Sequence, residues 1–270
     1  MRVGSQFLQI SGSTVLLTGA TGGIGHAIAR VLHSHGAELI LSGRRAEVLE
    51  RLGAELDARV LAVDLSIPAD VERLVTEAGD VDILIANAAL PASGTLESFS
   101  VDEIDRSLDV NLRAPIVLAH ELAPGMVERG RGHLLFMSSL AGKAATPRAA
   151  LYNASKFGLR GFATALRSDL RGTGVGVSAV FPGFISEAGM YADAEVKLPR
   201  GFGTRSPEDV ARAVVGAIER NRGEVDVAPL ALRAGTTFAS LAPELAGSLG
   251  RRLGSDEVSR KMADAQSDKR

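Results

Sequence analysis

The sequence predicts a doubly wound α/β fold, with a parallel sheet of about seven strands in a single domain and a helical extension at the C-terminus. Short apolar runs alternate with helical patterns along the chain. Several runs, such as Asp82–Ala86, are apolar throughout instead of alternating, which is typical of strands that helices cover on both faces. The chain has 270 residues, of which 46% are hydrophobic, enough for one large core.

The elements follow one another as strand and helix from the first run onward. Apolar and β-branched runs predict strands at Thr14–Thr18, Glu38–Ser42, Arg59–Val63, Asp82–Ala86, His133–Ser138, Val175–Phe181 and Glu224–Ala228. Helical spacing of apolar residues predicts helices near Gly23–His35, Ala46–Leu56, Pro68–Ala78, Val101–Arg129, Leu151–Arg171 and Pro207–Arg220. The strict alternation predicts a doubly wound sheet, whose ligands bind beyond the carboxyl ends of the strands.

A glycine-rich loop joins the first strand to the first helix. It reads Gly19-Ala20-Thr21-Gly22-Gly23-Ile24-Gly25. Glycines let the backbone approach a pyrophosphate closely, and the amides and dipole at the start of a helix hold the anion. A tight turn is the alternative, but the strand before and the helix after favour a Rossmann-like dinucleotide site.

Tyr152 and Lys156 lie four residues apart in the run Tyr-Asn-Ala-Ser-Lys. On a helix this spacing places both side chains on one face. A tyrosine hydroxyl titrates near ~10, and one ammonium at about 4 Å supplies on the order of 4 kcal/mol toward its ionisation. The pair therefore indicates acid–base catalysis, unless it is only part of a solvated helix face.

The loop spacing Gly-x-x-x-Gly-x-Gly after Thr18 resembles that of the short-chain dehydrogenase/reductase family. The resemblance extends over roughly Ser13 to Val227 and rests on separated motifs. Besides the loop and the Tyr152–Lys156 pair, these are Asp64-Leu65, Asn87-Ala88, Asn111, Ser139 and Pro182-Gly183. Ser139 precedes Tyr152 by 13 residues, as in the family.

The resemblance implies a role for each catalytic residue. Ser139 would steady the substrate carbonyl oxygen and Tyr152 would pass the proton. Lys156 would lower the pKa of the tyrosine and hold the nicotinamide ribose, and Asn111 would anchor a water relay. The reaction implied is hydride transfer between a nicotinamide and a carbonyl or secondary alcohol.

The chain departs from the family pattern in two places. Ala86-Asn87-Ala88-Ala89 stands where the family commonly has Asn-Asn-Ala-Gly, which retains the second asparagine. After Pro182-Gly183 the run Phe184-Ile185-Ser186 lacks the usual threonine. We expect Ser186 to replace that hydroxyl donor and Ile185 to contact the carboxamide through its backbone.

The end of the second strand indicates the cofactor. Proteins that bind NAD usually carry an acid there, and Gly43 takes that place here. Arg44 can bind a 2′-phosphate, which predicts NADP(H) in preference to NAD(H). The alternative is a solvated Arg-Arg pair that opens the next helix. The resemblance implies cofactor contacts from Gly19, Thr21, Gly22, Gly23, Ile24, Gly25, Gly43, Arg44, Arg45, Asp64, Leu65, Asn87, Ala88, Ala89, Tyr152, Lys156, Pro182, Gly183, Ile185 and Ser186; Asp64 has a turn or capping role as its alternative.

The predicted substrate site is apolar. The family places a substrate lid at about residues 187–204, and Leu90–Leu96 with Leu140–Ala149 should form the other walls. A hydrophobic ketone, a 3-oxoacyl compound or a steroid-like alcohol therefore fits better than a small charged acid. Lys143 and Arg148 could meet an acidic group such as a carrier phosphate, although exposed charge is the favoured interpretation of both.

We divide the chain into an N-terminal extension (1–12), an oxidoreductase domain (13–230) and a C-terminal helical extension (231–270). The extension contains an apolar segment, Ala234–Gly247, and an amphipathic helix, Ser255–Arg270, with Val258, Met262 and Ala265 on its apolar face. It could cover the active site, dock on a neighbouring subunit, touch a membrane surface or lie loosely on the protein.

Composition excludes several classes of protein. The net charge of −2 gives no reason to expect nucleic acid as a partner. The absence of cysteine excludes disulfides and thiolate catalysis, and the five histidines show no metal-binding spacing. No transmembrane segment or signal peptide is evident, so we predict a soluble, cytoplasmic protein. The resemblance implies a homotetramer or homodimer.

Two other functions stay open. A non-catalytic redox sensor or scaffold could bind NADP without turnover, although such proteins often lose the tyrosine or the lysine. A sugar-nucleotide epimerase would use the same three catalytic residues, but generally has a Gly-x-x-Gly-x-x-Gly loop and a larger C-terminal domain.

Overall fold

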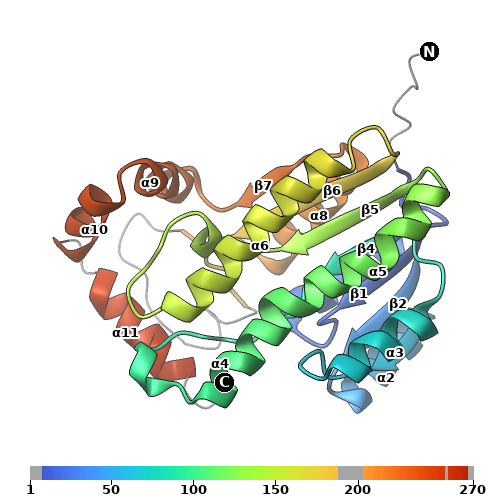
Figure 1. The fold of residues 1–270 in the computed structure, drawn as a ribbon, viewed down its shortest axis with the longest axis horizontal. Coiled ribbons are helices and arrows are strands. Elements are labelled where there is room, and N and C mark those ends of the chain that lie inside the picture. The colour runs from blue at the N-terminus through green and yellow to red at the C-terminus, as the bar shows by residue number, and fades with distance from the viewer. Residues whose placement is uncertain (1–7, 188–202, 253–254, 267–270) are drawn as a thin grey trace.

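A computed structural model describes residues 8–187, 203–252 and 255–266 of the chain. Its centre is a seven-stranded parallel sheet in the order β3-β2-β1-β4-β5-β6-β7 (Figure 1). The strands are β1 (Thr14–Thr18), β2 (Glu38–Gly43), β3 (Arg59–Ala62), β4 (Ile83–Ala86), β5 (Gly132–Met137), β6 (Val175–Pro182) and β7 (Glu224–Val227). The predicted fold class is therefore confirmed, and each predicted strand lies within one or two residues of its observed bounds.

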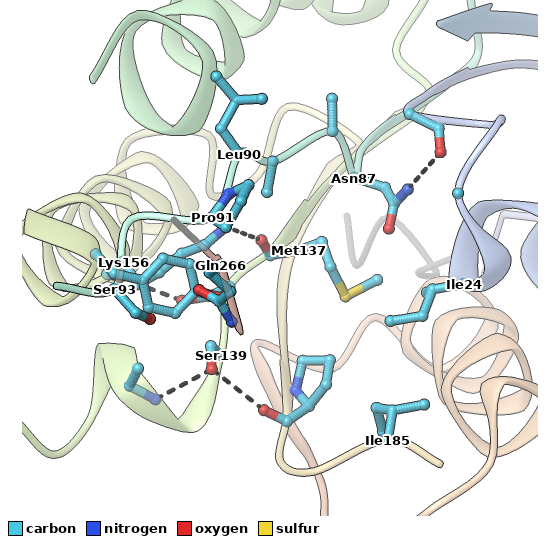
Figure 2. Close-up of a pocket in the computed structure, with 18 of the residues that line it drawn as sticks. Ile24, Asn87, Leu90, Pro91, Ser93, Met137, Ser139, Lys156, Ile185 and Gln266 are labelled. Atoms are coloured by element: carbon cyan, nitrogen blue, oxygen red, sulfur yellow. Dashed lines mark hydrogen bonds between the residues drawn. The ribbon is translucent and has the colours of Figure 1, made fainter. Parts of the chain in front are cut away.

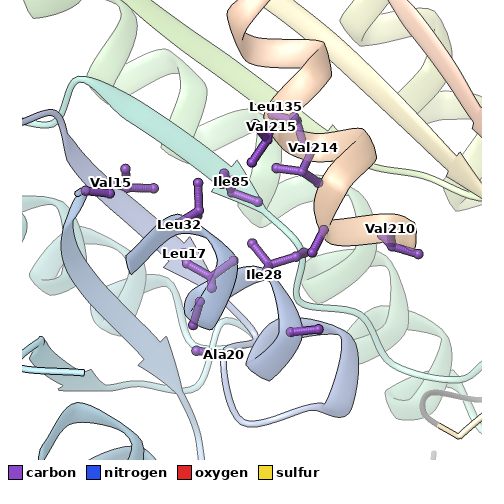
Figure 3. Close-up of a cluster of buried hydrophobic side chains, with 14 of the residues drawn as sticks. Val15, Leu17, Ala20, Ile28, Leu32, Ile85, Leu135, Val210, Val214 and Val215 are labelled. Atoms are coloured by element: carbon purple, nitrogen blue, oxygen red, sulfur yellow. The ribbon is translucent and has the colours of Figure 1, made fainter. Parts of the chain in front are cut away.

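Helices cover both faces of the sheet. On one face α1 (Gly23–Ser34), α2 (Ala46–Glu55) and α8 (Pro207–Glu219) contribute to one apolar cluster. On the other face α3 (Pro68–Ala78), α5 (Ala114–Glu128) and α6 (Ala150–Asp169) contribute to a second. Figure 3 shows the first cluster, where Ile28 and Leu32 of α1 meet Val214 of α8 over Leu17 and Ile85 of the sheet. Strands buried on both faces explain the continuous apolar runs in the sequence.

The predicted helix Val101–Arg129 is interrupted. The structure has α4 (Val101–Leu108), a π-helical turn (Asp109–Arg113) and then α5. Pro115 lies in the first turn of α5 and has no N–H to continue the α-helical ladder. The chain is thus helical from Val101 to Glu128, close to the predicted span, and the feature that the sequence did not reveal is the wider turn at Asn111, which needs the tertiary contacts described below.

The C-terminal extension forms three helices: α9 (Leu230–Leu241), α10 (Pro243–Arg252) and α11 (Ser255–Gln266). They lie beyond the carboxyl ends of the strands, at the left of Figure 1, and α10 contacts both α9 and α11. No helix in the described part of the chain is both long and apolar enough to cross a membrane.

The sheet buries a histidine that makes stability depend on pH. The His133 ring is 1% exposed in β5, and its Nε2 lies 2.8 Å from the Ser178 hydroxyl. Burial, with a smaller contribution from the charge of Arg167, lowers the pKa of His133 to about 3. Below pH ~6.5 the unfolded chain therefore binds a proton that the native protein does not, and the native state is destabilised as the pH falls toward 3.

We expect His133→Gln to remove this acid sensitivity, because the glutamine amide can replace the Nε2–H donor without titrating. Between pH 7.5 and 4.5 the wild type should lose about 2 to 3 kcal/mol more unfolding free energy than the variant. Urea titrations at both pH values measure this difference. His120→Gln, a change at an exposed histidine, is the control; equal pH slopes for wild type and His133→Gln would contradict the assignment.

Candidate active site

A cavity of about 990 Å³ lies beyond the carboxyl ends of the strands. The glycine loop, the ends of β2 and β4, the segment after β5 and helix α6 line it, and α9 and α11 close it (Figure 2). Parallel strands bring all of these segments to one edge, although they are far apart in the sequence. All predicted site residues line the cavity except Asn111 and Ser186.

At two positions of the glycine loop, Gly19 and Gly25, the structure has room only for glycine. Gly19 has φ +66°, and a Cβ atom there would lie 2.7 Å from the Cα of Ala88. A Cβ atom on Gly25 would lie 2.2 Å from the carbonyl oxygen of Gly19. The backbone is therefore packed closely where a pyrophosphate would approach the amides at the start of α1.

Asn87 and Thr18 fasten this loop to β4. The Asn87 amide donates to the carbonyls of Thr18 and Gly19 at 3.1 and 3.2 Å. The Thr18 hydroxyl accepts from the backbone N–H groups of Asn87 and Ala88, both at 3.1 Å. The retained asparagine thus has a direct contact with the loop, and Thr18 has a larger role than its sequence motif alone indicated.

Two arginines and one acid line the cavity where β2 and β3 end. Arg44 is exposed at the rim, whereas Arg45 donates a hydrogen bond to the carbonyl of Thr21 and so holds the glycine loop. Asp64 accepts from the Ser66 backbone and hydroxyl at 3.0 and 2.7 Å and pairs with Arg106 at 3.2 Å. Asp64 therefore forms the turn that the sequence left open, and because it also lines the cavity its contact with the cofactor stays a prediction.

The pKa of Asp64 reflects these contacts. Burial works against its ionisation, but hydrogen bonds from Ser66 and the charges of Arg106 and Arg44 outweigh burial and lower the pKa. Of the described residues that line the cavity, Asp64 is the sole carboxylate. The arginine charge at this end therefore exceeds the acid charge, which favours an anionic ligand.

Ser139, Tyr152 and Lys156 meet in the middle of the cavity. The Ser139 hydroxyl donates to the carbonyl of Pro182 at 3.4 Å and accepts from the N–H of Ala141 at 3.2 Å (Figure 2). Lys156 is 2% exposed, and its Nζ donates to the carbonyl of Met137 at 3.0 Å. The same Nζ lies 5.7 Å from the centre of the Tyr152 ring. The three side chains are thus held at the ends of β5 and β6 and in the first turns of α6.

Burial dominates the protonation of this trio. It raises the pKa of Tyr152, and hydrogen bonding with Ser139 opposes the rise. It also lowers the pKa of Lys156 to about 8. The lowering of the tyrosine pKa by the lysine, expected from the family resemblance, is not found, because Lys156 is directed to Met137 and both groups lack hydration. At pH 7 the lysine is still mostly protonated and can donate hydrogen bonds.

Asn111 lies beneath the cavity and does not line it. It is fully buried in the π-helical turn, where its Oδ1 accepts from the N–H of Leu90 at 2.6 Å and its Nδ2 donates to the carbonyl of Leu90 at 2.9 Å. The wide turn lets one side chain satisfy both backbone groups of Leu90. Asn111 therefore fixes the segment that follows Asn87–Ala89, and its role in a water relay stays a prediction.

Of the predicted cofactor residues at the end of β6 and after it, all but Ser186 line the cavity. Pro182, Gly183 and Ile185 line the cavity, and Ile185 is 3% exposed. Ser186 does not line it, because Ile185 and Arg205 form a bridge that directs the Ser186 N–H and hydroxyl to the carbonyl of Arg205 at 2.9 and 3.3 Å. The contact of the Ser186 hydroxyl with the carboxamide stays a prediction, which this orientation of Ser186 does not support.

The predicted walls agree with the structure only in part. Leu90, Pro91 and Ser93 line the cavity, as do most residues of Leu140–Ala149. Arg148 is exposed, in agreement with the favoured interpretation of its charge. Lys143 is not an exposed charge, because its Nζ forms ion pairs with Asp226 at 2.6 Å and Glu224 at 2.8 Å, both in β7. Most of the predicted lid (187–204) lies outside the described residues.

Sequence reasoning missed the walls that the C-terminal extension provides. Leu232 and Thr236 of α9 line the cavity, as do four residues of α11: Val258, Ser259, Met262 and Gln266. Of the roles left open for the extension, covering the active site is the one that the structure shows. The apolar spacing of Val258 and Met262 was the available signal, but it did not show which surface this face would contact.

Known proteins resemble this chain over most of its length. A model of the short chain dehydrogenase family matches residues 13–197. The chain belongs to the short-chain dehydrogenase/reductase family. Among curated members, the ketoacyl reductase HetN of Nostoc sp. is 37% identical over 227 residues, which cover 81% of this chain and 79% of HetN. The 3-oxoacyl-acyl-carrier-protein reductase FabG of Rickettsia prowazekii is 34% identical over 225 residues, covering 79% of this chain and 92% of FabG.

Solved structures of other members share the fold and contain both dinucleotides. A dehydrogenase from Sphingobium yanoikuyae in complex with NADPH has a TM-score of 0.75 and 26% identity, covering 88% of this chain and 95% of its own. A member from Burkholderia phymatum in complex with NAD has a TM-score of 0.78 and 27% identity, covering 88% and 96%. This short-chain dehydrogenase/reductase is thus an oxidoreductase of a family that binds nicotinamide dinucleotides.

Proposed function

We propose that the protein is an NADP(H)-dependent oxidoreductase that interconverts a carbonyl group and a secondary alcohol on a hydrophobic substrate. The convergence of Ser139, Tyr152 and Lys156 in one cavity with the glycine loop carries this proposal. The apolar walls and the names of the ketoacyl reductase relatives support a hydrophobic ketone or 3-oxoacyl compound. A steroid-like substrate has no specific support beyond the apolar walls.

The shape of the cavity fits a dinucleotide. Gly19 and Gly25 leave a backbone cradle that any Cβ atom would fill, and Arg44 is free of steric cover at the rim. Arg44 would bind the 2′-phosphate through charge-assisted hydrogen bonds, with no acid nearby on β2 to repel it. Lys156 would hold the nicotinamide ribose, and Ile185 would contact the carboxamide.

Each catalytic side chain has a distinct role in the proposed reaction. The bound nicotinamide supplies the hydride for the carbonyl carbon in the reducing direction. The Tyr152 hydroxyl gives its proton to the carbonyl oxygen, and its raised pKa keeps it in the protonated form that this step needs. Ser139 donates a hydrogen bond to the same oxygen as negative charge develops on it. The ammonium of Lys156, 5.7 Å from the centre of the Tyr152 ring, would oppose the cost of the phenolate that remains, although burial outweighs any such effect on the Tyr152 pKa in this structure.

A cofactor titration followed by a substrate panel tests this function. We expect the fluorescence of NADPH to change on binding at lower concentrations than that of NADH. NADPH should then be consumed with ketones and 3-oxoacyl thioesters, and more readily as their apolar bulk increases. Binding without turnover across the panel would favour the sensor or scaffold function, and no binding of either dinucleotide would contradict the interpretation of Gly19–Gly25.

A further inference from the structure

The last turn of α11 carries a glutamine into the substrate end of the cavity. Gln266 is 2% exposed, which is unusual for an amide so close to the end of a chain. Figure 2 shows it over the same cavity as Ser139 and Lys156, on the side of Ser93. Ala263, one turn earlier, is 4% exposed, so this end of the helix is packed inward.

One face of α11 is turned toward the cavity along the whole helix. Val258, Met262 and Gln266 follow one another at intervals of four residues, and all three line the cavity. On another face Lys261 pairs with Glu257 at 2.7 Å, with side-chain exposures of 54% and 62%. Leu232 and Thr236 of α9 continue the inner wall. The wall is thus apolar apart from the hydroxyls of Thr236 and Ser259 and the amide at its end.

This amide comes from a different element than the catalytic hydrogen-bonding groups. Ser139 and Tyr152, which are assigned to the reacting carbonyl, come from the end of β5 and from α6, whereas Gln266 comes from α11. An amide has two N–H donors and an acceptor oxygen, so Gln266 can take part in more than one hydrogen bond. A polar group placed precisely in an apolar pocket typically fixes the orientation of the ligand.

We propose that Gln266 is a specificity-determining residue that hydrogen-bonds a second carbonyl of the substrate, such as the thioester carbonyl of a 3-oxoacyl compound. Met262 and Val258 contact the apolar part of the same molecule. The C-terminal helix therefore selects 3-oxoacyl compounds over plain ketones of equal size. This inference rests on the carbonyl oxidoreductase function proposed above.

Substitutions at Gln266 test the selection. Gln266→Met keeps the length of the side chain and removes its hydrogen bonds. Gln266→Glu keeps the shape of the side chain but places a negatively charged carboxylate, which repels a carbonyl oxygen, where the amide stood. The probes are the N-acetylcysteamine thioester of 3-oxooctanoic acid and 2-octanone, with NADPH. Both variants should lower kcat/KM for the thioester roughly tenfold to a hundredfold and that for the ketone less than about threefold, as expected for the loss of one buried hydrogen bond. The effect on the thioester should fall mainly on KM.

Lys261→Gln is the matched control, since it changes the outward face of α11, and its thioester-to-ketone ratio should equal that of the wild type. Unchanged ratios in both Gln266 variants would overturn the inference while leaving the proposed function intact. Thermal stabilisation by the thioester in the presence of NADP gives a readout independent of turnover. If the thioester stabilises the wild type but not Gln266→Met, and no turnover is seen, the binding role of Gln266 holds and the proposed function fails. If no compound of the panel is bound or reduced, the inference and the proposed function both fail.

Discussion

Replacing Tyr152 with phenylalanine should leave NADPH binding within about twofold of the wild type and lower kcat on the order of a hundredfold to ten-thousandfold, the usual contribution of a positioned acid–base group. The ring would remain in place over the cavity, and only the hydroxyl that transfers the proton would be lost. Steady-state kinetics with the most active carbonyl compound, together with a fluorescence titration of NADPH, measures both quantities.

A control for this variant is available on the same helix. Thr164→Val removes an exposed hydroxyl from α6, which donates a hydrogen bond to the carbonyl of Arg160 at 2.9 Å. It should retain wild-type kinetics. If Tyr152→Phe retained most of its turnover, proton transfer would have to come from another group, and the catalytic assignment would be wrong.

Replacing Arg44 with aspartate should reverse the preference for the dinucleotide. The variant loses charge-assisted hydrogen bonds to the 2′-phosphate and gains a repelling carboxylate at the rim of the cavity. We expect the Kd for NADPH to rise roughly tenfold to more than a hundredfold, since such bonds contribute ~1.5–3 kcal/mol. The Kd for NADH should change little or improve, because aspartate can accept from the ribose hydroxyls.

Arg51→Asp provides the matched control for charge. It makes the same reversal on α2, where the Arg51 side chain contacts the backbone of Glu47 at 3.2 Å and does not line the cavity. Any general effect of the changed net charge on dinucleotide affinity would appear in both variants. Equal losses of NADPH and NADH affinity in Arg44→Asp would remove the basis for NADP preference and leave Arg44 and Arg45 as a helix-opening pair.

The sheet and the cofactor loop could be predicted from sequence because their signals are local. A strand buried on both faces is a run of apolar residues, as at Asp82–Ala86. Likewise, Gly19 and Gly25 are glycines because a Cβ atom would collide with Ala88 or with the loop itself. Since parallel strands all end at one edge, the order of the elements was enough to bring Ser139, Tyr152 and Lys156 together.

The features that the sequence did not reveal depend on contacts between distant segments. Ser186 turns to Arg205 because a bridge forms across residues far apart in the chain. Lys143 is only partly exposed because β7 brings Glu224 and Asp226 to it. The interruption at Asn111 depends on the backbone of Leu90. In each case the contacting residue lies far away in the sequence, and no local sequence pattern indicates that the contact forms.

The C-terminal helices show the same limit most clearly. The spacing of Val258 and Met262 predicted an amphipathic helix, but an apolar face alone does not identify its partner. Only the fold shows that α9 and α11 close the cavity and that Gln266 enters it. Part of the cavity wall is therefore formed by a part of the chain that carries no catalytic motif.

Transfer of deuterium from NADPH labelled at C4 of the nicotinamide tests the central claim most directly. The labelled cofactor is incubated with the protein and a 3-oxoacyl thioester, and the alcohol produced is analysed by mass spectrometry. Our account predicts one deuterium on the carbinol carbon with the cofactor labelled on one of the two faces, and nearly no product with Tyr152→Phe. An alcohol without deuterium from either labelled form, or bound cofactor with no alcohol formed across the panel, would contradict it.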